Sequence, residues 1–524
     1  MNTDLVIGVD IGTSSVKAGI YGLDGVALGT ATSAVGVDRH ADGSVTQSLD
    51  TLYDAAASAV TECLATTRAA PARVGAIAFS GQMAGVGLVD AYHRPIIPYD
   101  SWLDTRCGVV VDALSDEVRQ RILSVSGCAP TVAIGPKMAW WAQYQPEVVD
   151  TTAKFVTAAG YVAGRAAQLS GDEAFIDPSY LHFTSIADTA NGTWDTELAH
   201  VLGVPLDRLP RIVESSDIIG YVGPEAATDF GLPQGVPIAA GCGDTAACAV
   251  GAGIDQPLQA FDVAGTAAVL GIRLPSFVTD PTGTLLTMRS PLGSGAFALA
   301  YVGGAGELID WLCSVVLGHT AVDDRAYADL DQVAQDADAG SDGLLVSPHF
   351  SGRVTPAHPT MRGALIGLEP RHGRPQIARS VLEAIAYEYK IFAVAALALA
   401  GTDANAKVTQ VVGTGGGSKL RFWNEIKASV LDAPYSPLQG VDAGTRGAAL
   451  VALAAIGATV PSLGPNAAAA TVQPRRQDAD IYTETFANYV RWTRRLADGF
   501  TREPALATQT IDAGIKDPQN ENGE

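Results

Sequence analysis

The chain has 524 residues, which is too long for one ordinary hydrophobic core and predicts two to four domains. Acidic residues outnumber basic ones by 56 to 34, and the net charge of −22 argues against a nucleic-acid or anionic-membrane partner. Apolar residues make up 47% of the chain, as expected of a soluble globular protein.

The first 80 residues alternate between strand and helix patterns. β-Branched and apolar runs separated by turn residues predict four strands, and the helix between the third and the fourth is amphipathic. This order favours an α/β layer domain with a mixed sheet. The predicted strands are Leu5–Asp10, Val16–Tyr21, Val26–Ala34 and Val74–Phe79, and the predicted helix is Leu52–Leu64.

A similar opening recurs midway along the chain. Strands are expected over Ala260–Val263 and Val269–Leu274, with Gly265-Thr266 between them, as Gly12-Thr13 lies between the first two strands. The matching strand context indicates an internal duplication.

The duplication sets the expected domain boundary near residue 252. We expect an N-terminal domain at 1–252 that binds the acceptor and a C-terminal domain at 253–500 that binds the nucleotide. A helix over Gln376–Ala400 and a strand–glycine–helix unit at 408–431 would complete the second domain. The polar residues 505–524 predict a disordered tail.

Three further features bear on the compartment. The six cysteines form no CxxC pair, so we expect free thiols in a reducing environment. The longest apolar stretch, Ile377 to Ala400, contains four charged residues and predicts a buried or amphipathic helix rather than a membrane span. The N-terminus shows no signal-peptide pattern, and we expect a cytoplasmic protein with no membrane partner.

Small-residue loops are the first candidate functional elements. The loop from Asp10 to Lys17 exposes backbone N–H groups and hydroxyls between two strands, which suits phosphate, and Asp10 is placed to hold Mg²⁺ through waters. A plain hairpin is the alternative. Gly265-Thr266 offers a second such loop. The glycine run at 413–418 lacks the last glycine of a dinucleotide fingerprint, and the chain contains no P-loop.

Asp244 is the candidate catalytic carboxylate. It lies in Gly241-Cys242-Gly243-Asp244-Thr245, directly after a predicted strand at Val236–Ala240, where flanking glycines leave it closely approachable. The alternative is an Asp that only caps the following helix, Thr245–Gly251. The histidines form no ligand set, and no G-x-S-x-G elbow occurs.

The order of these motifs over residues 4–495 resembles the FGGY carbohydrate kinases of the actin/Hsp70-like superfamily. Gly363–Leu368 followed, seven residues later, by Gln376–Glu383 matches the C-terminal signature of that family. The other matching elements, in family order, are the Asp10 loop, Gly81-Gln82-Met83, Trp102–Arg106, Pro136–Trp140, the Asp244 turn, Ala305-Gly306, Gly415–Gly417 and Trp423-Asn424.

Within the family the chain is most similar to the xylulose kinases, with informative departures. Ala84 stands where those enzymes usually have a His that lies in the sugar pocket, which puts D-xylulose itself in question. Ser351–Pro356 replaces a usual Gly-Glu-Arg-Thr-Pro, Leu420 replaces a common Ser, and the N-terminal signature around Lys137 is matched in part.

The resemblance implies two actin-like (ribonuclease H-like) α/β domains, with mixed sheets flanked by helices and a deep cleft between them. ATP and Mg²⁺ would bind there with a small sugar or polyol, a ketopentose being favoured, and Asp244 would be the catalytic base despite an ordinary pKa of about 3.9. The implied site residues are Gln82, Met83, Trp102, Asp104 and Asp244 for the acceptor; Thr13, Ser14, Ser15, Gly265, Thr266, Gly306, Gly416, Gly417 and Asn424 for the nucleotide; and Asp10 and Asp244 for the metal.

Several alternatives stay open from the sequence. The acceptor could be ribulose, another ketose, a tetritol or glycerol, because function is set by the site and not by the fold. A non-catalytic sensor of ATP or sugar, or an Hsp70-like ATPase, would use the same fold, although the intact Asp10 and Asp244 argue against a dead enzyme. The oligomeric state is open, with a homodimer as one alternative.

Overall fold

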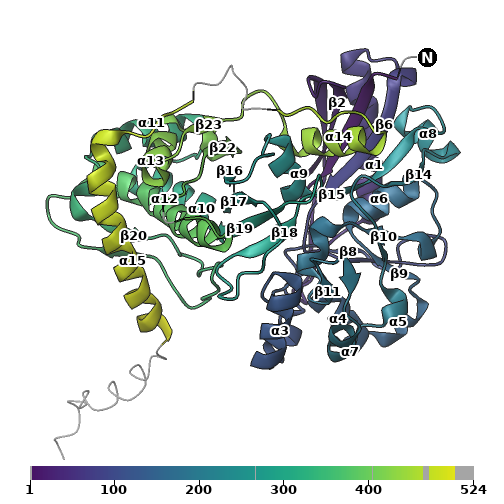
Figure 1. Ribbon diagram of the computed structural model, residues 1–524, viewed down its shortest axis with the longest axis horizontal. Coiled ribbons are helices and arrows are strands. Elements are labelled where there is room, and N and C mark those ends of the chain that lie inside the picture. The colour runs from purple at the N-terminus through teal and green to yellow at the C-terminus, as the bar shows by residue number, and fades with distance from the viewer. Residues whose placement is uncertain (1–2, 266, 404, 464–470, 502–524) are drawn as a thin grey trace, which may run out of the picture.

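The computed structural model describes residues 3–501 except 266, 404 and 464–470, and these residues form two lobes that lie side by side (Figure 1). Each lobe is built on a six-stranded mixed sheet with helices packed against it. The expected fold class, two α/β domains with mixed sheets flanked by helices, is confirmed. The predictions for Thr266 and for the tail at 505–524 fall outside the described residues.

The sheet of the first lobe has the order β3-β2-β1-β6-β15-β14. Strand β1 pairs antiparallel with β2 and parallel with β6, and β6 pairs parallel with β15. The bounds of its strands are β1 (Leu5–Ile11), β2 (Ser15–Gly22), β3 (Ala27–Ala34), β6 (Val74–Gly81), β14 (Ile218–Tyr221) and β15 (Pro237–Gly243).

Helices and short strands surround this sheet. The helices of this part of the chain are α1 (Leu49–Thr67), α2 (Gly108–Asp112), α3 (Asp116–Ser126), α4 (Ile134–Tyr144), α5 (Pro146–Thr151), α6 (Ala158–Ala166), α7 (Thr196–Leu202), α8 (Pro224–Phe230) and α9 (Asp244–Gly251). The short strands are β4 (Asp38–Arg39), β5 (Val45–Gln47), β7 (Gly87–Val89), β8 (Tyr99–Asp100), β9 (Lys154–Val156), β10 (Phe175–Ile176), β11 (Ala187–Asp188), β12 (Thr193–Trp194) and β13 (Arg211–Ile212).

The second lobe repeats the topology of the first. Its sheet has the order β18-β19-β17-β16-β22-β23, in which β16 pairs antiparallel with β17 and parallel with β22, as β1 does with β2 and β6. The repeated pattern of pairing supports the duplication that the two Gly-Thr loops indicated. The strands are β16 (Gln259–Ala264), β17 (Ala268–Leu274), β18 (Leu286–Arg289), β19 (Ala296–Val302), β20 (Leu345–Ser347), β21 (Ala364–Ile366), β22 (Gln410–Thr414) and β23 (Tyr435–Pro437). The helices of the second lobe are α10 (Ala305–Trp311), α11 (Asp324–Gln335), α12 (Arg374–Leu399), α13 (Arg421–Leu431) and α15 (Ala479–Thr501), and α14 (Ala443–Ala455) lies between α13 and α15 in sequence.

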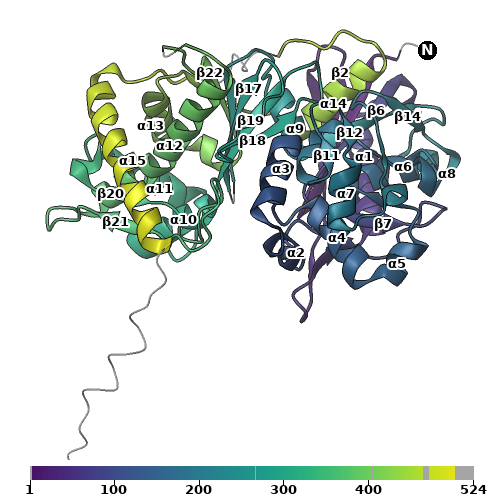
Figure 2. The same cartoon turned by 60° about the horizontal axis from the view of Figure 1, so that its bottom comes forward.

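Helix α14 joins the two halves of the chain. It follows β23 of the second sheet in sequence, yet it packs on β1 and β6 of the first sheet and against α9 (Figures 1 and 2). The two helices cross so closely that only glycine fits at two positions. A Cβ atom on Gly447 would lie 1.9 Å from the Ala247 carbonyl oxygen, and one on Gly251 would lie 1.9 Å from the Ala443 carbonyl oxygen. The domain division at residue 252 stays a prediction.

The free cysteines and the buried apolar helix are as the sequence predicted. All six cysteines are free thiols; five are buried and Cys248 is half-buried. In the described part of the chain no helix is long and apolar enough to cross a membrane. Helix α12, the apolar stretch with internal charges, instead buries Arg379, Glu383 and Glu388 against the second lobe.

Candidate active site

Parallel strands of the first sheet end side by side, and two carboxylates stand at those ends. Asp10, near the end of β1, is in register with Ser80 of β6, and Gly243, the last residue of β15, is in register with Gly81. Asp244 follows at once as the first residue of α9. Ligands of α/β sheets bind at the carboxyl ends of parallel strands. The fold therefore brings Asp10 and Asp244 together at a position that suits a ligand.

The carboxylate of Asp244 is tuned by its surroundings. The Thr245 N–H and hydroxyl donate to Asp244 Oδ1 at 2.6 and 3.1 Å. Burial and the nearby Asp10 carboxylate raise the pKa of Asp244 to about 7, although the hydrogen bonds from Thr245 act in the opposite direction. A carboxyl that titrates near neutral pH is a better proton acceptor than an ordinary one. The expectation of an ordinary pKa of about 3.9 is therefore wrong for Asp244.

Asp10 lies in an environment with excess negative charge. Burial and the charge of Asp442 raise the pKa of Asp10 to about 6, while Ser80, whose hydroxyl donates to Asp10 Oδ1 at 2.8 Å, lowers it. Lys17 is engaged with Asp442 at 2.8 Å. A Cβ atom on Gly444 would lie 2.7 Å from Asp10 Oδ2, so the start of α14 presses directly on this carboxylate.

The donor set fits a hydrated divalent cation. The Asp10 carboxylate raises the pKa of Asp244, as a nearby like charge does when no cation lies between the two groups. Mg²⁺ takes oxygen ligands and keeps several waters, so two carboxylates beside a phosphate suffice. Within the described residues, no group of three or more His, Cys, Asp or Glu side chains could hold a metal by itself.

The first Gly-Thr loop contacts the predicted acceptor residues. The Thr13 carbonyl accepts from the Gln47 side-chain amide at 3.0 Å, and its hydroxyl accepts from the Trp102 indole N–H at 2.8 Å. Ser14 is exposed and Ser15 is half-buried. Trp102, predicted for the acceptor, and Thr13, predicted for the phosphates, therefore belong to one connected cluster.

Gln82 and Met83 lie at the end of β6, beside the Asp244 turn. The Gln82 amide donates to Gln47 Oε1 at 2.7 Å, while Gln82 Oε1 is buried and has no hydrogen-bond partner among the described residues. Met83 packs on the turn before Asp244, since a Cβ atom on Gly243 would lie 2.7 Å from its Sδ. Ala84, which follows Met83, has a left-handed backbone with φ of 63°.

Asp104 is engaged inside the protein. It is 1% exposed, and its carboxylate accepts from the Val45 N–H at 3.0 Å and from Arg106 Nε at 2.9 Å. Its own carbonyl accepts from the buried Lys137. These bonds give Asp104 a bracing role in this structure, and its contact with an acceptor stays a prediction.

A cavity of about 470 Å³ lies beside the β16–β17 loop of the second lobe. Its volume is within the range usual for small-molecule sites. Four of the predicted nucleotide residues line it: Gly265, Gly306, Gly416 and Gly417. Side chains that the sequence did not single out, among them Glu307, Tyr327, Asp331 and Arg421, also line it. They reach the cavity from α10, α11 and α13, and no local sequence motif predicts that these three helices converge there.

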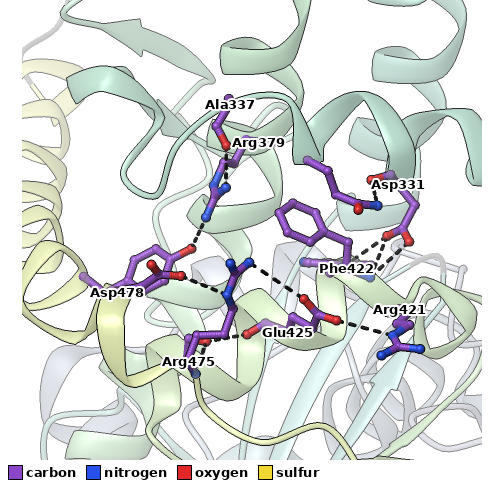
Figure 3. Close-up of polar contacts among 12 residues, drawn as sticks. Asp331, Ala337, Arg379, Arg421, Phe422, Glu425, Arg475 and Asp478 are labelled. Atoms are coloured by element: carbon purple, nitrogen blue, oxygen red, sulfur yellow. Dashed lines mark hydrogen bonds and ion pairs between the residues drawn. The ribbon is translucent and has the colours of Figure 1, made fainter.

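Helix α13 carries one wall of this cavity and is fixed from two sides. The Asp331 carboxylate of α11 accepts from the Phe422 N–H at 3.0 Å, at the start of α13 (Figure 3). Glu425 on the same helix pairs with Arg421 at 3.3 Å and with Arg475 at 3.9 Å, as Figure 3 shows. These contacts hold Trp423, the residue after Phe422, in the cavity wall.

Asn424 is the exception among the predicted nucleotide residues. It is 2% exposed, its amide donates to the Ser418 carbonyl at 2.7 Å, and its Oδ1 has no partner among the described residues. It borders a neighbouring cavity of about 460 Å³ rather than the one lined by the glycines. Its contact with adenosine stays a prediction.

The duplicated sheets, the paired carboxylates at converging strand ends and the glycine-lined cavity define a protein of the actin-like ATPase fold. The chain belongs to the FGGY family of carbohydrate kinases. The model of the family's N-terminal domain matches residues 5–251, and that of its C-terminal domain matches residues 262–456. It is therefore an ATP-dependent carbohydrate kinase.

Curated relatives and solved structures agree with this assignment. A xylulose kinase of Staphylococcus epidermidis is 25% identical over 458 residues, which cover 87% of this chain and 89% of that protein. The xylulose kinase of Escherichia coli is 28% identical over 446 residues, covering 84% and 87%. The crystal structure of a xylulose kinase from Rhodospirillum rubrum superimposes with a TM-score of 0.83 at 25% identity, covering 95% of this chain and 100% of that one.

Proposed function

We propose that the protein transfers the γ-phosphoryl group of ATP to a hydroxyl of a small sugar or polyol, with a ketopentose as the favoured acceptor class. The observation that carries this proposal is the Asp244 carboxylate, which stands beside Asp10 at the ends of parallel strands and has a pKa raised to about 7. The names of the relatives, which are xylulose kinases at 25% and 28% identity, support the acceptor class.

In the proposed mechanism, Asp244 accepts the proton of the acceptor hydroxyl while the oxygen attacks the γ-phosphorus in line. A pKa near 7 leaves much of the carboxyl ionised at neutral pH and makes it a stronger base than an ordinary Asp. In a loose phosphoryl transfer the proton moves late. Most of the catalysis comes from positioning and from charge stabilisation. Asp244 therefore contributes orientation of the hydroxyl as well as proton transfer.

The nucleotide would lie in the glycine-lined cavity, with its phosphates between the two Gly-Thr loops. Gly265, Gly306, Gly416 and Gly417 line that cavity and leave room for a close approach. Asp10 and Asp244 would hold Mg²⁺, which neutralises charge on the transferred phosphoryl group. The phosphate contacts of Thr13, Ser14, Ser15 and Thr266 belong to this proposal.

The acceptor would lie against Gln82, Met83 and Trp102. The buried, unpartnered Gln82 Oε1 is available to accept a hydrogen bond from a sugar hydroxyl. Ala84 offers no side-chain hydrogen bond, so a hydroxyl that a His would bind loses that partner. A site that hydrogen-bonds a hydroxyl discriminates by about 10⁴–10⁵, and an apolar wall discriminates far less. We favour an acceptor that differs from D-xylulose at that hydroxyl or is bulkier there.

The test is a coupled ADP-release assay with D-xylulose, D-ribulose, erythritol and glycerol. Asp244→Asn should lower kcat by about 10²–10⁴, the usual loss for a general base. Exposed Asp24→Asn is the matched control and should retain the wild-type rate. Absence of acceptor-dependent ADP release with the whole panel would support the sensor alternative, and wild-type turnover by Asp244→Asn would remove the base assignment.

The same panel tests the acceptor through Ala84→His. The left-handed backbone at Ala84 tolerates His better than most residues, so the variant should fold. We expect Ala84→His to raise kcat/KM for D-xylulose relative to the other acceptors. If the wild type already prefers D-xylulose with kcat/KM of about 10⁴ M⁻¹s⁻¹ or more and the variant gains nothing, the doubt about D-xylulose is misplaced.

A further inference from the structure

A third cavity, of about 570 Å³, lies where the two lobes meet, away from the candidate active site. The ends of α9 and α14 form one wall, and the turn between β18 and β19 forms the opposite wall. Much of the lining is apolar. Its residues are Glu214, Ser216, Val250, Gly253, Ile254, Asp255, Arg273, Pro291, Leu292, Gly293, Leu450, Ala454, Val460, Pro461, Ser462 and Leu463.

Arg273 of β17 is the cation of this cavity, and its guanidinium is fixed in place. One of its nitrogens donates to the Ser290 hydroxyl at 2.5 Å, and the group lies 5.0 Å from the centre of the Phe297 ring. It also lies flat against the main chain, because a Cβ atom on Gly295 would be 2.7 Å from it. The guanidinium is therefore oriented before any ligand arrives.

This guanidinium is half-buried and unpaired. Burial lowers the pKa of Arg273, and the charge of Asp255 compensates only in part. No carboxylate of the described residues lies within ion-pair distance of it, in a chain with 56 acidic side chains. The two acidic residues of the cavity have other partners: Glu214 pairs with Arg289 at 3.3 Å, and Asp255 accepts from the Ser462 hydroxyl.

We propose that this cavity is a second ligand site, which binds a small organic anion through a carboxylate or a phosphate on Arg273. A planar, pre-oriented guanidinium recognises either group with paired hydrogen bonds. The apolar wall formed by Val250, Ile254 and Leu450 would cover the body of the ligand. Since both lobes supply the lining, a bound anion bridges them and resists their separation.

The probes are phenyl phosphate and benzoate, with benzyl alcohol as the uncharged analogue. Calorimetry is performed on the full chain in saturating ADP and Mg²⁺, so that the candidate active site is occupied. We expect both anions to bind the wild type, Arg273→Met to weaken binding about tenfold or more, and Arg273→Lys to fall between them. Benzyl alcohol should bind no tighter to the wild type than to Arg273→Met.

A second variant tests the cavity without touching the guanidinium. Ala454→Phe fills the cavity from α14 and should abolish binding of both anions while Arg273 stays in place. Wild-type kcat/KM and thermal midpoint establish that each variant is folded. Equal affinity for phenyl phosphate in the wild type and Arg273→Met would overturn the proposal and leave Arg273 as a brace of its turn. So would the absence of binding to the wild type at about 10 mM anion.

Discussion

The raised pKa of Asp244 predicts that removing its charge stabilises the ligand-free protein. The folded state holds the Asp244 proton up to a pKa of about 7, whereas the unfolded chain releases it near the ordinary value of 3.8. Between these values the folded state binds the extra proton, so raising the pH lowers the free energy of unfolding. Asn cannot ionise, and Asp244→Asn should escape this penalty.

The magnitude follows from the size of the pKa shift. Each pKa unit corresponds to about 1.4 kcal/mol, so a shift of about 3 units sets an upper bound of ~4 kcal/mol above pH 7. Asp244 and Asp10 titrate together and Asp244 is only half-buried, so we expect about half of that bound, ~2 kcal/mol at pH 8. The gain should shrink as the pH falls and should vanish near pH 4.

The assay is thermal unfolding of wild type and Asp244→Asn at several pH values between 4.5 and 8, in chelator. A gain of ~2 kcal/mol should raise the midpoint of the first lobe by roughly 4–8 °C at pH 8. The control is Asp442→Asn. Burial raises the pKa of Asp442, but Lys17 outweighs it and holds that pKa below the ordinary value, so this substitution should destabilise the protein at pH 8.

Mg²⁺ provides a second readout of the same charge. If Asp10 and Asp244 hold the ion, added Mg²⁺ with ADP should stabilise the wild type more than Asp244→Asn and so narrow the difference at pH 8. A midpoint for Asp244→Asn that is lower than that of the wild type at pH 8, or a difference that does not change with pH, would refute the electrostatic reasoning.

Three further outcomes are expected. Gly416→Val should leave the thermal midpoint unchanged, because a Cβ atom there meets nothing within 4 Å, and should weaken ATP binding in calorimetry, because Gly416 lines the cavity. The control Gly499→Val, on α15, is equally unobstructed and should bind ATP normally. Asp262→Asn should lower the free energy of unfolding by about 3–5 kcal/mol, because it leaves the fully buried Lys427, 2.6 Å away, without a counter-charge. In urea unfolding, the double variant with Lys427→Met should recover much of that loss. Gly8→Ala should destabilise by about 1–3 kcal/mol, since its Cβ atom would lie 1.9 Å from the main chain of α14; an unchanged urea midpoint would contradict that packing.

Local sequence patterns were sufficient to place most of the elements that carry the site. The strands predicted at Leu5–Asp10 and Val74–Phe79 are observed as Leu5–Ile11 and Val74–Gly81, and the helix at Leu52–Leu64 extends to Leu49–Thr67. The position of Asp244 after a glycine turn also followed from the sequence. These features depend on side-chain periodicity and turn chemistry, which act over a few residues.

The charge state of the site could be decided only by tertiary structure. The pKa of Asp244 is raised because β1 and β15 end on either side of β6, which places Asp10 nearby across 234 positions of sequence. The sequence predicted Asp104 as a residue that contacts the acceptor, and only the fold shows that its carboxylate is bonded to Arg106 and to the main chain of β5. Burial and Coulomb interactions depend on which distant segments meet, and no local pattern encodes that meeting.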